Sequence, residues 1–359
     1  MNIEVERITA LKGFIQPLLF PFKSTWKDRQ ILYIGGVGEG HSLLERQFPE
    51  AAVTRGDAET VITGEYSAAT FDYITAPGLG TGGFDIPQLF TRLLSLLKPG
   101  GIISAGVYGY AGYYGLDMVG RIIRNFAGGL SDLSDKKNLS RLIRIVKAVI
   151  SQLPSNHPAL QRKAFIKCLE KGDKNTVKEL INLSKDKIFT VLQLLECIEG
   201  SGGRLAGWVF PGCYRPAHYV ERETAEKLET LPEPQRWKAA ELINASPAEH
   251  YFFMGKKDYR PVKVDWDSGD LYLWKPVRLP LYRWEEVEGI GSDKCTVSPT
   301  IDVEGLDSME LESWQVQFCL SASGASTVNG LLKKPSPQIV EFLKQAVENR
   351  LLALLPPSA

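Results

Sequence analysis

The sequence predicts an α/β fold built on a doubly wound sheet, and two observations carry this prediction. The apolar run 31–34 is followed by Gly36, Gly38 and Gly40 and then by a helical pattern. Strand-like and helix-like segments keep alternating as far as Tyr108, which is typical of a parallel sheet with crossover helices. A strand that ends in a glycine turn and opens a helix presents backbone N–H groups to a ligand, and this suits a nucleotide-like molecule.

The glycine spacing narrows the class of ligand. The dinucleotide fingerprint requires a third glycine three residues after the second, and the sequence has His41 at that place. A nicotinamide or flavin cofactor is therefore disfavoured. A turn that binds no ligand is the alternative interpretation of the glycines.

The segments after this helix follow in a regular order. A short strand within 48–57 ends in Asp57, and a second strand begins at Phe71. A helix follows, stops at the Lys-Pro-Gly-Gly run 98–101, and leads into a strand over 102–108. Ligands of doubly wound sheets lie outside the carboxyl ends of the strands, so the residues after each strand are candidate site residues.

In order and spacing, these pieces resemble the class I S-adenosylmethionine-dependent methyltransferases. The resemblance implies S-adenosyl-L-methionine as the cofactor, with its methionine part at the glycine turn. It also implies that an acid after the second strand binds the ribose hydroxyls, and Asp57 is the acid at that place. Later segments resemble a bacterial subset with a long helical insertion after the fifth strand, over about residues 25–255. That subset does not share one substrate, so the expected acceptor is a small molecule or a peptide.

Two departures from the family pattern affect the cofactor site. Ile34 stands where the end of the first strand is commonly acidic, so one charged partner for the cofactor's amino group is missing. The intervals from Gly40 to Asp57 and from Asp57 to Phe71 are too short for the family's usual strands and helices. We therefore expect one strand and helix pair to be shortened or lost.

The shortening leaves Asp57 with two interpretations inside the family pattern. It is either the acid that binds the ribose or the acid that contacts the adenine amino group, and a carboxylate accepts hydrogen bonds in both roles. A solvated turn aspartate is the structural alternative. Glu59 is a weaker candidate for a second acidic contact with the cofactor.

Residues 112–190 read almost wholly as helix and are placed to form a lid over the substrate. Tyr108, at the end of the fifth strand of the family pattern, and Tyr113 are candidates to shape the substrate site; core aromatic residues are the equal alternative. His157 lies in a break of the helical pattern and is the best candidate for a general base. A structural histidine is the favoured alternative.

Composition excludes several other classes of protein. With 42 basic and 42 acidic residues, the chain lacks the electrostatic footprint of a protein that binds nucleic acid or an anionic membrane. Its five scattered cysteines, without a C-x-x-C pair, indicate free thiols and argue against a zinc site. No apolar run reaches the length of a membrane span. We predict a cytoplasmic protein without a metal, a nucleic-acid partner or a membrane anchor.

A change of composition near residue 258 predicts two domains. Residues 1–258 form the methyltransferase domain, and residues 259–359 form a smaller α+β domain that faintly resembles a winged helix. A structural cap or dimer surface is the favoured role of this second domain, which leaves a homodimer open. The predicted whole is a Rossmann-like methyltransferase with a helical lid. The alternative is a protein that keeps this fold, has lost turnover and serves as a binding or scaffold subunit.

Overall fold

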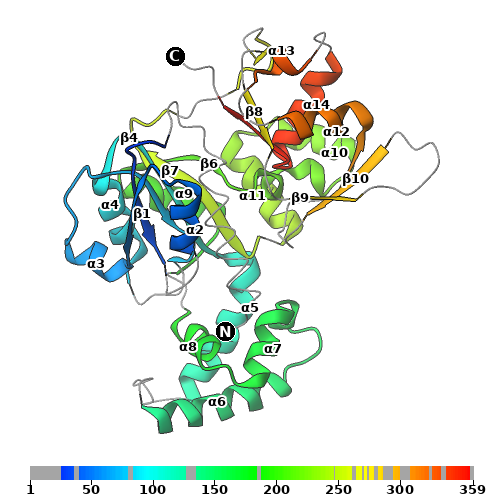
Figure 1. Cartoon of the computed structure of the whole chain (residues 1–359). Coiled ribbons are helices and arrows are strands. Elements are labelled where there is room, and N and C mark those ends of the chain that lie inside the picture. Colours follow the sequence, from blue (N-terminus) through cyan, green and yellow to red (C-terminus); the bar gives the residue numbers. More distant parts are fainter. Residues whose placement is uncertain are drawn as a thin grey trace.

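A computed structural model describes the greater part of the chain (Figure 1). The described residues are 26–35, 40–79, 84–126, 135–183, 187–245, 247–260, 264–268, 271–272, 275–278, 282–285, 294–299, 308–322, 326–332 and 337–355. Gly36 and Gly38 lie outside these ranges, whereas Gly40 is the first residue of helix α2 (Gly40–Gln47). The helix predicted after the glycine turn is thus confirmed.

A seven-stranded sheet organises the first two thirds of the chain. Its strands are β1 (Gln30–Ile34), β2 (Ala52–Gly56), β3 (Phe71–Ala76), β4 (Leu97–Gly109), β5 (Ile188–Phe189), β6 (Gly203–Trp208) and β7 (Glu249–Lys256). The order is β2-β1-β3-β4-β7-β6, with β5 on β4. Strands β1 to β5 pair in parallel, and β7 runs antiparallel to both β4 and β6. The predicted doubly wound α/β class is confirmed.

The central strands are apolar because both faces of the sheet are covered. All six residues of β3 are buried, and so are the last four residues of β1, as expected for parallel strands with helices on both sides. Helix α4 (Ile86–Leu96) begins where Asp85 accepts a hydrogen bond from the amide of Gln88 at 2.7 Å. Its buried leucines and Phe90 join the same core as the strands.

The interval between β2 and β3 is as short as the sequence predicts. It contains α3 (Ala58–Thr63) and no strand. Strand β2 therefore lies at the end of the described sheet, paired with β1 alone. This arrangement confirms that a strand and a helix of the family pattern are lost here.

Strand β4 begins earlier than the sequence predicts. The Lys-Pro-Gly-Gly run that we expected to be a stop before the strand belongs to the strand itself, which starts at Leu97. Gly100 has a φ of 76°, and the register of β4 against β3 shifts between Phe71 and Tyr73. The run ends helix α4 as predicted, but the chain continues at once as an irregular strand because glycine accepts this backbone conformation.

The helical insertion leaves the sheet at the carboxyl end of β4 and returns at β5. It contains α5 (Tyr110–Phe126), α6 (Lys136–Ser151), the short η3 (Pro158–Gln161), α7 (Lys163–Lys171) and α8 (Lys174–Asn182). Figure 1 shows these helices extending away from the sheet as a body of their own. They enclose a separate apolar core, to which Leu142, Val146 and Ile150 of α6 contribute as predicted.

Helices α9 (Val191–Gly200), α10 (Arg222–Glu229) and α11 (Glu233–Asn244) complete the part of the chain around the sheet. The C-terminal part is α+β, as expected. It has β8 (Lys275–Arg278), β9 (Tyr282–Glu285), β10 (Lys294–Pro299), β11 (Met309–Glu312) and β12 (Leu352–Leu355), with α12 (Ser313–Ser321), α13 (Val328–Leu331) and α14 (Pro337–Glu348). Within the described ranges, no helix combines the length and the apolar composition that crossing a bilayer requires.

The C-terminal part shares one apolar core with the sheet. Buried residues such as Leu271, Phe342 and Leu352 belong to the same cluster as the central strands. Arg350, which follows α14, donates hydrogen bonds to the carbonyls of Trp208 and Val209 at 2.8 Å each. Residues on both sides of position 258 are thus packed together.

Candidate functional site

The carboxyl ends of the parallel strands meet at one edge of the sheet. Strands β1, β2, β3 and β4 end there at Ile34, Gly56, Ala76 and Gly109, and the chain leaves β1 toward the start of α2. This edge is where doubly wound sheets bind their ligands. The predicted site residues after β1, β2 and β4 therefore belong to one edge of the molecule.

Asp57 follows β2 directly and caps helix α3. Its Oδ1 accepts a hydrogen bond from the amide of Thr60 at 2.8 Å, and its own amide donates to Thr60 Oγ1 at 3.2 Å. The Thr60 amide lowers the pKa of the exposed Asp57 carboxyl. A carboxylate has about four acceptor positions, so the cap leaves capacity for a ligand. The structural alternative and the cofactor role are compatible at this residue.

The other residues predicted at the cofactor edge differ in exposure and in their neighbours. Glu59 lies in the first turn of α3 with an exposed side chain. Ile34, which replaces the family's usual acid, is 5% exposed at the end of β1. His41 lies in α2, where its Nδ1 is 3.4 Å from Glu45 Oε2. Glu59 therefore stays a proposal, and Ile34 gives the end of β1 an apolar side chain in place of a charged one.

Tyr108 and Tyr113 come together at the junction of the sheet and the helical insertion. Their rings stack with centroids 4.1 Å apart, and each residue is 4% exposed. The Tyr108 hydroxyl donates a hydrogen bond to Glu179 of α8. The Arg162 guanidinium lies 5.0 Å from the centre of the Tyr113 ring, a distance at which a cation is attracted to an aromatic face.

Strand β7 adds two more groups to this junction. Tyr108 is opposite Glu249 in the register of β4 and β7, and Gly106 is opposite Tyr251. The Tyr251 hydroxyl donates a hydrogen bond to Glu249. A Cβ at position 106 would lie 2.6 Å from Cε1 of Tyr251, so a glycine is required there to admit the ring.

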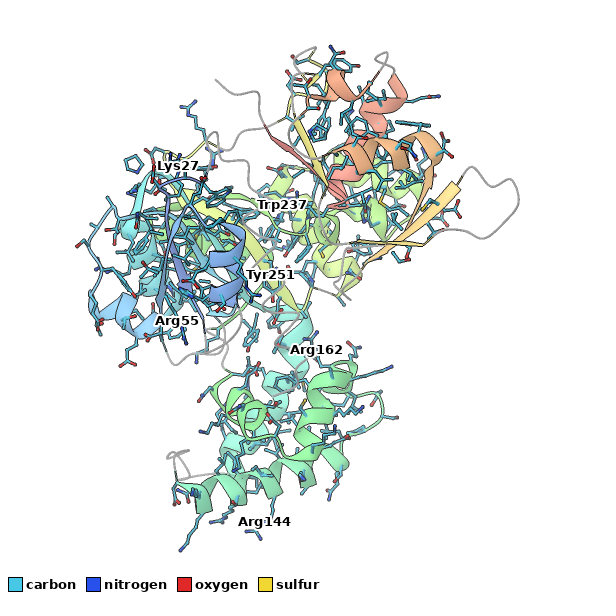
Figure 2. The ribbon with its side chains drawn as sticks, in the orientation of Figure 1. Lys27, Arg55, Arg144, Arg162, Trp237 and Tyr251 are labelled. Carbon is cyan, nitrogen blue, oxygen red and sulfur yellow. The ribbon has the colours of Figure 1, made fainter. Side chains whose placement is uncertain are left out.

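These six residues are called the Tyr108 cluster: Tyr108, Tyr113, Arg162, Glu179, Glu249 and Tyr251. In Figure 2, Arg162 on the insertion and Tyr251 on the sheet lie on the two sides of the junction. The cluster contains two carboxyl groups, each hydrogen-bonded to a tyrosine hydroxyl, and one guanidinium. The cluster lies at the carboxyl end of β4.

Burial sets the protonation of the Tyr108 cluster. It raises the pKa of Tyr108, Tyr113 and Tyr251, so these hydroxyls stay protonated and donate hydrogen bonds at neutral pH. Burial also raises the pKa of Glu179; the Tyr108 hydroxyl opposes this effect and the Glu249 carboxyl adds to it. The hydroxyls of Tyr108 and Tyr251 are therefore donated to Glu179 and Glu249 within the cluster, and these carboxyl groups keep further acceptor positions.

His157 begins the short helix η3, in the break where the sequence predicts it. Its Nδ1 accepts a hydrogen bond from the amide of Ala159 at 3.2 Å. In a neutral ring with Nδ1 as the acceptor, the proton is on Nε2. The backbone cap thus occupies the ring nitrogen that a general base would use.

This geometry predicts a measurable cap at His157. His157→Ala is expected to lower the free energy of unfolding by about 1 kcal/mol, because the Ala159 amide loses its acceptor. His157→Asn supplies another acceptor and should restore the stability. Urea denaturation of both variants checks this. Equal midpoints for the alanine variant and the wild type would show that the cap contributes nothing.

Four members of the Tyr108 cluster have no signal in the sequence. Glu179 is separated from Tyr108 by 71 positions, and Glu249 and Tyr251 lie on a strand that reaches β4 only through the antiparallel pairing of the sheet. A charged residue on an amphipathic helix, such as Glu179, or between two helices, such as Arg162, is normally solvated. Only knowledge of the sheet order would have indicated these neighbours.

No protein-family model matches the chain. Among solved structures, PKMT2 from Rickettsia typhi matches with a TM-score of 0.61 and 13% sequence identity, over 97% of this chain and 75% of that chain. The same protein in complex with AdoHcy matches with a TM-score of 0.59 and 13% identity, over the same shares of the two chains. At this identity the likeness is one of fold.

The fold is that of the class I S-adenosylmethionine-dependent methyltransferases. The match extends over nearly the whole chain, so it includes the helical insertion and the C-terminal part as well as the sheet. The resemblance predicted from the sequence is confirmed at the level of the fold.

Proposed function

We propose that the protein is an S-adenosylmethionine-dependent methyltransferase that acts on a small-molecule or peptide acceptor. One observation carries the proposal: the parallel order β2-β1-β3-β4 brings the start of α2, Asp57 and the Tyr108 cluster to the same edge of the sheet. The solved structure of PKMT2 in complex with AdoHcy, which has the same fold, supports the choice of cofactor.

The residues of this edge fit the cofactor. The amino end of α2 offers backbone N–H groups and a positive dipole, which suit the carboxylate of the methionine part. Asp57 is an exposed, ionised carboxylate directly after the strand next to β1, and this position favours ribose binding over adenine binding. Gly36, Gly38, Gly40 and Glu59 stay proposed contacts on the strength of the sequence.

S-adenosylmethionine supplies an electrophilic methyl group on a sulfonium centre. The chain has to hold the acceptor in line and to remove a proton where the acceptor carries one. We assign acceptor binding to the Tyr108 cluster, whose tyrosines donate hydrogen bonds and whose carboxyl groups accept them. Tyr108 and Tyr113 are the proposed acceptor-side residues, and Glu249 is the group best placed to take a proton. His157 stays a proposed general base. Its Nδ1 would first have to lose the hydrogen bond from the Ala159 amide.

Isothermal titration calorimetry tests the cofactor assignment. We expect S-adenosylmethionine to bind in the micromolar range, or about −8 kcal/mol, and Gly38→Val to abolish binding because a branched side chain fills the turn. NAD serves as the control ligand. No binding to the wild type, or tighter binding of NAD, would contradict the proposal. Binding without methyl transfer to any of a panel of amines, acids and peptides would favour the scaffold alternative.

A further inference from the structure

The charges of the chain are divided unevenly between the helical insertion and the rest. Residues 110–187 contain 15 of the 42 basic residues and 7 of the 42 acidic ones, with histidine counted as neutral. The insertion therefore has a formal charge of +8 and the remainder a formal charge of −8. The neutral total of the chain, which argues against an anionic partner, conceals this separation of charge.

The acids of the insertion mostly have structural roles. Asp117 is 3% exposed and pairs with two arginines of α5, and Glu179 belongs to the cluster at the junction with the sheet. Asp135 and Asp173 cap α6 and α8. Among the described residues of the insertion, only the acid Glu170 has no such role. The acids therefore leave most of the surface of the insertion positive.

Nine basic residues of the insertion are exposed and form no ion pair within the described ranges of the chain. They are Lys136, Lys137, Arg141, Arg144, Lys147, Lys163, Lys167, Lys171 and Lys174. Lys147 of α6 lies against the turn that follows α7, since its Nζ would be 3.2 Å from a Cβ at Gly172. Gly172 follows Lys171 directly, so the cations of α6 lie next to those at the end of α7.

The first turns of the insertion helices contain cations where acids are expected. Helices α6, α7 and α8 begin with Lys136, Lys163 and Lys174, and none of the three has an acid in its first turn. The positive end of the helix dipole lies there, so acids stabilise this place and cations destabilise it. The stability of the helices therefore does not explain these lysines, and a negatively charged partner does.

Lys137, Arg141 and Arg144 form a row along α6. Residues four and three positions apart share one face of a helix, and the buried leucines of α6 are on the opposite face. Figure 1 shows α6 lying across the end of the insertion that is farthest from the sheet. Arg144 lies at that same end in Figure 2. The row therefore faces away from the sheet and from the Tyr108 cluster.

We propose that this end of the insertion binds the anionic phospholipid surface of a membrane, without crossing it. Such a surface attracts clustered cations within about 10 Å at 0.1 M salt. It repels the acidic remainder of the chain, so the protein is held with α6 toward the lipid and the sheet away from it.

Two further observations favour lipid over nucleic acid. Helix α5 runs from the sheet toward this end of the insertion (Figure 1) and closes with exposed Ile122 and Phe126, which are 37% and 70% exposed. Apolar side chains beside cations suit the headgroup region of a bilayer. Helix α6 contains no aromatic residue, so its basic face lacks the rings on which the bases of a single strand stack.

Co-sedimentation of the full chain with vesicles tests the proposal. We expect binding to vesicles of phosphatidylcholine mixed with phosphatidylglycerol, and none to vesicles of phosphatidylcholine alone. The binding should disappear between about 0.1 M and about 1 M salt, because the screening length falls from about 10 Å to 3 Å. A DNA duplex and polyuridylate are titrated in parallel. Failure to bind the anionic vesicles, or tighter binding of either nucleic acid, would overturn the proposal.

Two triple variants locate the contact. The first combines Lys137→Gln, Arg141→Gln and Arg144→Gln and should weaken vesicle binding roughly 100-fold. The second removes the same charge from exposed positions outside the insertion, on α10 and α11, and should bind as the wild type does; it combines Arg222→Gln, Lys227→Gln and Lys238→Gln. Circular dichroism checks that both variants are folded. An equal loss of binding in the two variants would show that net charge, and not this end of the insertion, governs binding.

Discussion

Asp57→Ser is expected to weaken the binding of S-adenosylmethionine by about 1.5–3 kcal/mol, which is roughly 10- to 150-fold. Serine accepts the hydrogen bond of the Thr60 amide and caps α3 as aspartate does, but it offers no negative charge to the ribose hydroxyls. The melting temperature of the ligand-free protein should stay nearly unchanged. Calorimetry and thermal denaturation measure the two effects separately.

Thr60→Ala is the matched control for Asp57. It removes the hydroxyl of the capping box but keeps the amide that Asp57 accepts from. We expect a loss of stability of about 0.5 kcal/mol or more and an unchanged affinity for the cofactor. Asp57→Ala is less informative because it removes the cap and the charge together. If Asp57→Ser binds S-adenosylmethionine with wild-type affinity, the role of Asp57 is purely structural.

Asp72→Ala is expected to lower the free energy of unfolding by about 2–3 kcal/mol. The carboxylate of this β3 residue lies 2.6 Å from Arg29 Nη1, 2.7 Å from Lys98 Nζ and 2.9 Å from the amide of Gln30. Its side chain is 7% exposed. The two cations are about one third exposed, so water screens part of the interaction. The expected loss of free energy is therefore below that for breaking a fully buried ion pair.

The same contact predicts a pH dependence. Burial alone would raise the pKa of Asp72, but the hydrogen bonds from Gln30, Lys98 and Arg29 lower it overall. The stabilisation is therefore complete above the unfolded-state pKa of about 4 and is lost as the pH falls through the lower folded-state pKa. Urea midpoints should show a smaller difference between wild type and Asp72→Asn near pH 2 than at pH 7. An equal difference at both pH values would rule out the linkage.

The part of the fold that the sequence predicts is the part that depends on short-range patterns. Helix α2 after β1, Asp57 after β2, and Phe71 at the start of β3 lie where the spacing places them. The same spacing indicates the lost strand and helix. These features depend on residues within a few turns of each other, so local propensity and hydrophobic periodicity decide them.

The Tyr108 cluster illustrates what the sequence cannot predict. Tyr108 and Tyr113 are candidates because they lie at the end of a strand and at the start of the insertion, but the partners of Tyr108 come from α8 and β7. The antiparallel entry of β7 between β4 and β6 decides which side chains meet there. In the same way, His157 lies in the predicted helix break, but only the geometry shows that its Nδ1 serves the backbone.

Arg350 connects the C-terminal part of the chain to the sheet through two hydrogen bonds. The residue has a φ of 57° and reaches from the end of α14 to two carbonyls at the end of β6. Burial lowers its pKa to about 10, so it still carries its charge at neutral pH. If the segment after residue 258 were replaced by an unrelated one, both carbonyls would lose the Arg350 guanidinium as their hydrogen-bond donor. The sheet and the C-terminal part are therefore expected to be inherited as one unit.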